Sequence, residues 1–118
     1  MRFMHEMGIA NSILDRAQAE IEHHSNARLL KVGVRIGEWS GVEPESLRFC
    51  FDCLVSGAAP PLPVIDIEIC PRQNRCPACA TVFKLDGYNI ECPSCGVTPT
   101  QPVSGDELQI AYVEMEEQ

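Results

Sequence analysis

Four cysteines arranged in two pairs constrain this chain more than any other feature of its sequence. Cys76 and Cys79 are separated by two residues, as are Cys92 and Cys95, and twelve residues lie between the pairs. Two such turns can bring four thiolates to the corners of a tetrahedron, the arrangement that Zn²⁺ takes in structural sites. Gly96 permits a tight backbone turn directly after the last cysteine. The spacing therefore predicts a structural zinc site held by Cys76, Cys79, Cys92 and Cys95.

The segment around these cysteines, residues 71–102, differs in composition from the rest of the chain. Cysteine, proline and turn residues dominate it, and apolar periodicity disappears. Because the segment has too few apolar residues to form a core, we expect zinc to supply its folding free energy. A redox pair of the thioredoxin kind needs a strand leading into a helix, and neither pair has one. A site of four thiolates is also closed to substrate, which predicts a structural role for the zinc rather than a catalytic one.

The other three of the seven cysteines are Cys50, Cys53 and Cys70. An odd number, with no secretory pattern at the start of the chain, indicates a reducing compartment rather than a disulfide framework. Cys50 and Cys53 fall on a predicted helix whose apolar stripe also holds Leu47 and Leu54. Because free cysteine is commonly buried as a small hydrophobe, we expect all three to be core residues.

Outside the cysteine segment, apolar periodicity predicts helices and strands. Apolar residues at steps of three and four indicate helices, and strict alternation indicates half-buried strands. Pro44 suits a first helical position, where its missing N–H would have no partner anyway. The predicted elements are a short strand at the start, a helix from Met7 to about His24–Asn26, a strand over Leu30–Ile36, a helix over Pro44–Leu54, and strands over Ile65–Ile69 and Glu107–Met115.

This order of elements predicts an α+β fold built from both ends of the chain. We expect a small mixed sheet of about three strands with two helices, plus an inserted zinc-ribbon-like four-cysteine domain. The predicted boundaries are residues 1–70 and 103–118 for the α+β domain and 71–102 for the zinc-binding domain.

The charge balance bears on function. The chain carries 17 acidic against 9 basic residues, a formal charge of −8. Phosphate-backbone binding needs clustered Lys and Arg, so the balance opposes nucleic acid as a partner. A zinc-ribbon interaction or nucleic-acid-binding module stays the alternative. No apolar run approaches the length of a membrane helix, and no signal pattern opens the chain, so we expect a cytoplasmic protein with no membrane partner. No catalytic set or phosphate loop is visible, so we expect no enzyme.

His5 stands out because it lies almost at the amino end, between Met4 and Glu6. In a chain that began at Met4, the free amine, the His5 backbone nitrogen and the His5 imidazole could form fused chelate rings, and the Glu6 backbone nitrogen could complete a plane. Tetragonal nitrogen sets of this kind suit Ni(II) or Cu(II). The pair His23-His24 ends the first predicted helix, where capping or solvent exposure is the simpler expectation and metal binding the alternative.

Several motifs taken together resemble one family. Met4-His5-Glu6 opening a helix, the block IGEWSGVEPESLRFCFDCL, the CPAC and CPSC turns and the late SGDEL appear in the same order as in the hydrogenase nickel-incorporation proteins, the HypA/HybF family. The resemblance spans the chain from Met4 onward. It implies a small α+β nickel domain with a zinc domain, in a metallochaperone. For the oligomeric state, a monomer and a homodimer both stay open.

The resemblance also implies roles and partners. His5 would be the side-chain nickel ligand, Glu6 would contribute its backbone nitrogen and hold its carboxylate nearby, and Met4 would belong to the same nickel site. The four paired cysteines would hold structural Zn²⁺, and Ni²⁺ would be the transported ion. The family works with a HypB-type GTPase, delivers nickel to the [NiFe]-hydrogenase large subunit precursor, and in some organisms supplies urease.

One departure from the family pattern affects the nickel site. The family begins at the methionine before the histidine, whereas Met1, Arg2 and Phe3 precede Met4 here. With these residues present, the Met4 nitrogen is an amide and not a free amine. An amide nitrogen must lose a proton to bind a metal, and it gives up that proton far less readily. An upstream start codon or a cloning extension, a variant with altered nickel binding, and recruitment of a distant ligand each account for them. We expect weaker nickel binding near neutral pH when they are present.

Overall fold

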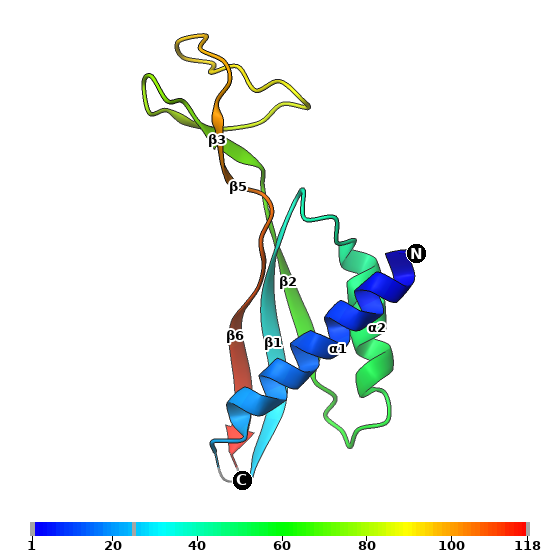
Figure 1. Ribbon diagram of the computed structural model, residues 1–118. Helices are drawn as coiled ribbons and strands as arrows, with labels where there is room; N and C mark the ends of the chain where they lie inside the picture. The colour runs from blue at the N-terminus through cyan, green and yellow to red at the C-terminus, as the bar shows by residue number, and fades with distance from the viewer. Residues whose placement is uncertain (1, 25, 118) are drawn as a thin grey trace. The chain divides into compact units, whose positions relative to one another are not determined.

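The computed structural model describes residues 2–24 and 26–117, which form two helices and two small sheets (Figure 1). The three-stranded sheets have the strand orders β2-β1-β6 and β4-β3-β5. In chain order the elements are α1 (Arg2–Ile21), β1 (Ala27–Gly37), α2 (Pro44–Val55), β2 (Val64–Cys70), β3 (Gln73–Arg75), β4 (Val82–Lys84), β5 (Gln101–Ser104) and β6 (Leu108–Glu117). The predicted fold class, two helices with a three-stranded sheet and a four-cysteine cluster, is confirmed.

The chain divides into two compact units. The first comprises Met1–Arg35, Val42–Glu68 and Gln109–Gln118, and the second comprises Ile36–Gly41 and Ile69–Leu108. The second unit thus includes the segment between β1 and α2 in addition to the cysteine region. The domain boundaries at residues 71 and 102 stay a prediction.

The core of the first unit lies where α1 and α2 pack against each other and against β1 and β2 (Figure 1). Its fully or nearly buried apolar side chains are Ala10, Ile13, Ala17 and Ile21 of α1, Leu29, Val32 and Val34 of β1, Val42 just before α2, Leu47, Cys50, Phe51 and Val55 of α2, and Ile65 of β2. The steps of three and four along both helices explain the buried stripes. Burying the Val, Leu, Ile and Phe side chains among them contributes about 1.5–3 kcal/mol each relative to exposure.

Helix α1 begins earlier than predicted, and the short strand expected before it is wrong. The helix already includes Arg2 and continues through Met4, His5 and Glu6. Its buried stripe of Ala10, Ile13, Ala17 and Ile21 continues one turn toward the amino end through Glu6. Because an acidic residue interrupts the apolar pattern at that position, periodicity alone could not extend the helix there.

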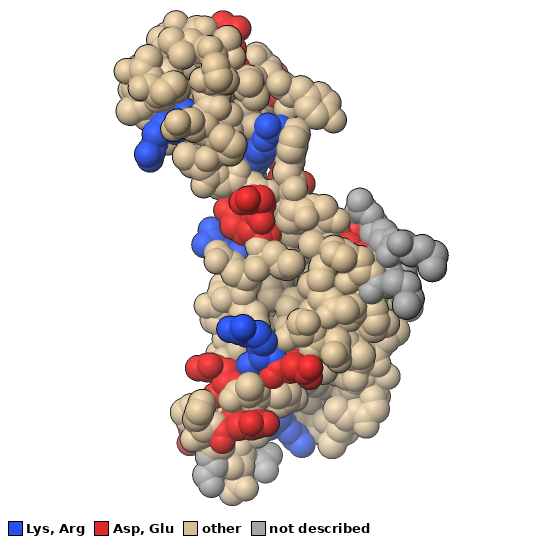
Figure 2. Space-filling model, viewed as in Figure 1, with Lys and Arg blue, Asp and Glu red and all other residues tan. Residues whose placement is uncertain are grey.

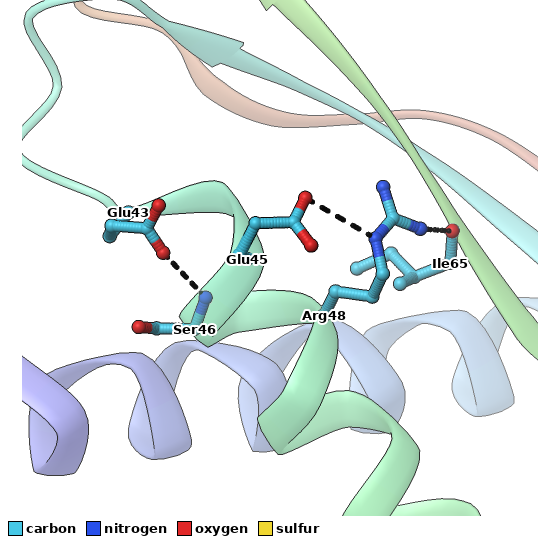
Figure 3. A network of polar contacts seen from close by, with 5 residues as sticks. All are labelled: Glu43, Glu45, Ser46, Arg48 and Ile65. Atoms are coloured by element: carbon cyan, nitrogen blue, oxygen red, sulfur yellow. Dashed lines mark hydrogen bonds and ion pairs between the residues drawn. The ribbon is translucent and has the colours of Figure 1, made fainter.

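The amino end of α2 is capped by a carboxylate. Pro44 occupies the first turn as predicted, and the Glu43 side chain accepts a hydrogen bond from the Ser46 amide at 2.6 Å. This is the side-chain cap that a helix start requires, because its first amides have no intrahelical partner. Arg48 lies 3.8 Å from Glu45 and donates to the Ile65 carbonyl of β2 at 3.0 Å, so α2 is also attached to the sheet (Figure 3).

A tyrosine bridges the first sheet across its central strand. Tyr112 of β6 lies over Gly33 of β1, where a Cβ atom would clash with the ring. The Tyr112 hydroxyl donates to Asp66 of β2. Gly33 is therefore required by close approach of the ring, and the hydrogen bond joins the two strands on either side of β1.

None of the helices described here is both long and apolar enough to cross a membrane.

Candidate metal centres

The second unit holds its cysteine turns on the short sheet β4-β3-β5. Central strand β3 pairs antiparallel with β4 and with β5. Cys76 and Cys79 lie in the turn that joins β3 to β4, and Cys92 and Cys95 lie in the connection from β4 to β5. These three strands were not predicted, because each has only three or four residues and no apolar alternation. They position the two turns.

Both cysteine turns have the same backbone geometry. In the first, the Ala80 amide donates to the Cys76 carbonyl at 2.9 Å and the Cys76 amide to the Thr81 carbonyl at 2.9 Å. In the second, the Gly96 amide donates to Cys92 at 2.9 Å and the Cys92 amide to Val97 at 3.0 Å.

Each turn ends in a left-handed residue. The φ angle is +65° at Ala80 and +78° at Gly96. The predicted role of Gly96 is confirmed, whereas Ala80 adopts the same conformation although it carries a Cβ atom, which costs about 1–2 kcal/mol.

The four cysteine sulfurs converge. All four lie within 4.8 Å of one another, with Cys76 and Cys92 buried and Cys79 and Cys95 exposed. The Cys76–Cys95 sulfur distance is 3.4 Å and the Cys79–Cys92 distance is 3.7 Å. Four sulfurs around Zn²⁺ at ordinary bond length lie roughly 3.8 Å apart. The donor set and its spacing therefore fit a tetrahedral metal ion.

Contacts within the protein shift the pKa values of these thiols. A hydrogen bond with Thr81 lowers the pKa of Cys79 to about 6. The pKa of Cys95, which a backbone hydrogen bond from Val97 lowers, is raised overall to about 12 by the hydrogen bond to Cys76 and by burial. Because metal ligation requires thiolates, proton release should accompany metal binding here.

A buried polar network connects the segments that carry the cysteines. Asn74 of β3 is 1% exposed, and its side-chain amide donates to the Thr100 hydroxyl at 2.9 Å. The Thr100 hydroxyl in turn donates to the Ile90 carbonyl, two residues before Cys92. Sequence reasoning missed this network, because an isolated Asn and Thr carry no spacing signal.

A second set of contacts attaches residues 36–41 to the same unit. The Arg72 guanidinium lies 3.2 Å from the centre of the Trp39 ring, and the Arg72 amide donates to Glu38 at 3.1 Å. Trp39 also meets Tyr88 edge to face, with ring centres 5.6 Å apart. The connection between β1 and α2 thereby becomes part of the cysteine unit.

The nickel-site residues predicted from the sequence lie in the amino-terminal turns of α1. His5 is exposed, whereas Glu6 is fully buried with 0% exposure. The Glu43 amide donates to Glu6 Oε2 at 2.9 Å, so the carboxylate is directed into the unit. The side chain of Met4 lies outside the described residues. The nickel-site assignment stays a prediction.

The other two histidines, His23 and His24, lie far from His5. His23 is exposed, and His24 Nδ1 lies 3.1 Å from a Glu117 oxygen at the end of β6. About 24 Å of helix separates His5 from Ile21, at 1.5 Å per residue, so these histidines do not reach His5 within one chain. Among the described residues, the four cysteines are the one group of three or more potential metal ligands that converge.

The core prediction holds for two of the other three cysteines. Cys50 is 0% and Cys70 4% exposed, which confirms both as core residues, and burial raises the pKa of the Cys50 thiol. Cys53 is exposed, so the prediction for it was wrong. Leu54, expected on the same buried stripe, is also exposed, because α2 presents its Cys53 and Leu54 side to solvent.

Fold and site together define a small α+β protein with a separate unit built around four converging cysteines. The sequence model described as "Hydrogenase/urease nickel incorporation, metallochaperone, hypA" matches residues 4–115. The chain belongs to this HypA family of nickel metallochaperones, which confirms the resemblance read from its motifs.

Individual relatives and solved structures agree with this assignment. Hydrogenase maturation factor HypA of Geobacter sulfurreducens is 35% identical over 113 residues, covering 96% of this chain and 100% of the relative. That of Chlorobium limicola is 38% identical over 114 residues, covering 97% and 98%. The solution structure of the nickel metallochaperone HypA from Helicobacter pylori has a TM-score of 0.63 at 19% identity, covering 96% and 98% of the two chains. A second HypA solution structure has a TM-score of 0.72 at 20% identity, covering 98% of each. At these identities the two structures support the fold alone.

Proposed function

We propose that this chain binds Ni(II) through the Met4-His5-Glu6 segment and delivers it to the [NiFe]-hydrogenase large subunit precursor. The observation that carries the proposal is the exposed His5 imidazole in the amino-terminal turns of α1, in a chain of this family. Imidazole and backbone nitrogens suit Ni(II) in a tetragonal set. An exposed site can also pass its ion to a partner by ligand exchange.

The zinc part of the proposal assigns Cys76, Cys79, Cys92 and Cys95 to one structural Zn²⁺. The sulfur spacing supports this role, and four thiolates leave no open position for substrate. The bound zinc would supply folding free energy to a unit with few buried apolar side chains. It carries out no chemical step.

Membership of the family supports a proposal for the partners. We propose a HypB-type GTPase and the hydrogenase large subunit precursor as partners, acting in the cytoplasm. The net charge of −8 supports a partner with a basic surface. On the face shown in Figure 2, Lys and Arg side chains are scattered among Asp and Glu. No continuous basic patch for a phosphate backbone is visible on that face.

Residues 1–3 should weaken nickel capture. In an α-helix that includes Arg2, the Glu6 amide is paired with the Arg2 carbonyl. Coordination by the Glu6 nitrogen must remove this amide proton and break that hydrogen bond. In a chain beginning at Met4, the amides of His5 and Glu6 would be among the first four of the helix, which have no intrahelical partner.

The test is calorimetric titration of Ni(II) at neutral pH into two zinc-loaded proteins, the chain as written and a chain beginning at Met4. Mass spectrometry verifies each terminus, and His5→Ala is made in both. Tighter one-to-one binding by the shorter chain, lost on His5→Ala, is the expected result. Nickel binding that does not depend on His5 in either protein would remove the nickel-site assignment.

A further inference from the structure

Two neighbouring residues of the nickel segment lie in opposite environments. His5 is exposed, while Glu6 has no exposed surface at all. A carboxylate is almost never fully buried unless a hydrogen bond or an opposite charge offsets the loss of hydration. The burial of Glu6 therefore requires specific partners in the fold.

The partner is the start of the other helix. The Glu43 amide donates to Glu6 Oε2 at 2.9 Å, and Glu43 is the N-cap residue of α2. The positive end of the α2 dipole lies at this point and favours a negative charge. Glu6 Oε1 has no hydrogen-bond partner among the described residues. The Glu43 amide and the helix end thus hold the carboxylate, and they join the first turns of α1 to the start of α2.

This contact stabilises a part of α1 that would otherwise open readily. A helix start is its least stable part, because its first amides have no intrahelical partner. Nickel capture by the Glu6 backbone nitrogen needs the helical turn ahead of Glu6 to open. A contact that holds Glu6 and its turn in place therefore competes with that capture.

We infer that the Glu6 carboxylate is a positioning group and not a nickel ligand: it holds the amino-terminal turn of α1 helical and so opposes nickel binding by the Glu6 backbone nitrogen. This inference rests on the proposed function, since it concerns His5-dependent nickel binding. A ligand role would require the carboxylate to leave the Glu43 amide and the start of α2. The positioning role leaves both contacts intact in the metal-free protein.

The experiment is Ni(II) titration at fixed neutral pH into the zinc-loaded chain as written. Glu6→Ala keeps the backbone nitrogen and removes the carboxylate, so nickel should bind about tenfold tighter, the lower end of what a hydrogen bond to a charged group contributes. The added affinity should disappear in the His5→Ala, Glu6→Ala double variant. Glu20→Ala removes an exposed carboxylate farther along the same helix and should leave the affinity unchanged.

A second variant and a second measurement guard against misfolding. Glu6→Gln keeps the shape and one acceptor oxygen, and should bind nickel about threefold tighter, since neutral hydrogen bonds are roughly half as strong. Amide hydrogen exchange in residues 2–9 of the metal-free protein should be faster in both variants. If Glu6→Ala does not fold, Glu6→Gln decides.

Nickel binding that is weaker or unchanged in the Glu6 variants would overturn the inference. The two proposals fail separately. Native binding that persists in His5→Ala rejects the proposed function. Binding that needs His5 but is indifferent to Glu6→Ala rejects only the positioning role.

Discussion

Replacing Thr100 with valine tests how the buried polar network supports the metal centre. Valine has nearly the same shape but lacks the hydroxyl, which accepts from Asn74 and donates to the Ile90 carbonyl. The variant leaves the buried Asn74 amide and the half-buried Ile90 carbonyl without these partners. An unpaired buried group costs about 1–3 kcal/mol, and a half-buried one costs less. The expected loss is therefore about 2 kcal/mol.

That loss should appear as weaker metal binding. Folding of the cysteine unit and metal binding share one free energy, so 2 kcal/mol corresponds to roughly thirtyfold weaker zinc affinity. The assay is equilibrium competition with a chromogenic zinc chelator. Thr98→Val makes the same change at an exposed position and is the matched control. Zinc affinity within twofold of the native value in Thr100→Val would refute the reasoning.

Three further changes test other parts of the structure. Ala80→Gly should stabilise the metal-bound protein by up to about 1 kcal/mol, and Gly96→Ala should destabilise it by about 1 kcal/mol, because both positions have positive φ. Chemical denaturation measures both changes, and a Gly96→Ala variant that is more stable than the native protein would contradict this explanation. The hydrogen bond to Asp66 raises the pKa of Tyr112 to about 12. The stability that this hydrogen bond contributes is therefore complete below pH 10, the pKa of tyrosine in the unfolded chain, and is lost as the pH rises to 12. Tyr112→Phe should abolish this alkaline loss of stability, and an identical dependence of stability on pH in the variant would argue against it. Removing zinc with a chelator should speed amide exchange in residues 73–104 far more than in 10–21, and equal acceleration of both would show that the metal is not a local folding element.

Much of the architecture follows from local patterns. Most of the buried stripes of α1 and α2 follow from helical periodicity, and Pro44 marks the start of α2. The cysteine cluster follows from two short spacings in segments rich in proline and turn residues, because a Cys-Pro-x-Cys turn presents both sulfurs on one side. The same two-residue gap between Cys50 and Cys53 lies on helix α2 and forms no such turn. Features of this kind depend on residues a few positions apart, so the chain alone specifies them.

The burial of Glu6 shows what local patterns cannot supply. An acidic residue near the amino end predicts exposure, and its partner is a backbone amide 37 residues away. The same reason hid the helical turn ahead of it, the Asn74–Thr100 network, and the exposure of Cys53. In each case the environment of a side chain depends on a distant segment.

The two proposed metal sites therefore depend on the sequence to different degrees. Spacing along the chain was enough to predict the site of Cys76, Cys79, Cys92 and Cys95. The turns that gather their sulfurs are closed by hydrogen bonds between residues four and five positions apart. The nickel site was predicted only from the motif formed by Met4, His5 and Glu6. Whether the Glu6 carboxylate points to solvent or into the core was decided by the packing of α1 against α2, because only that contact brings the Glu43 amide to it.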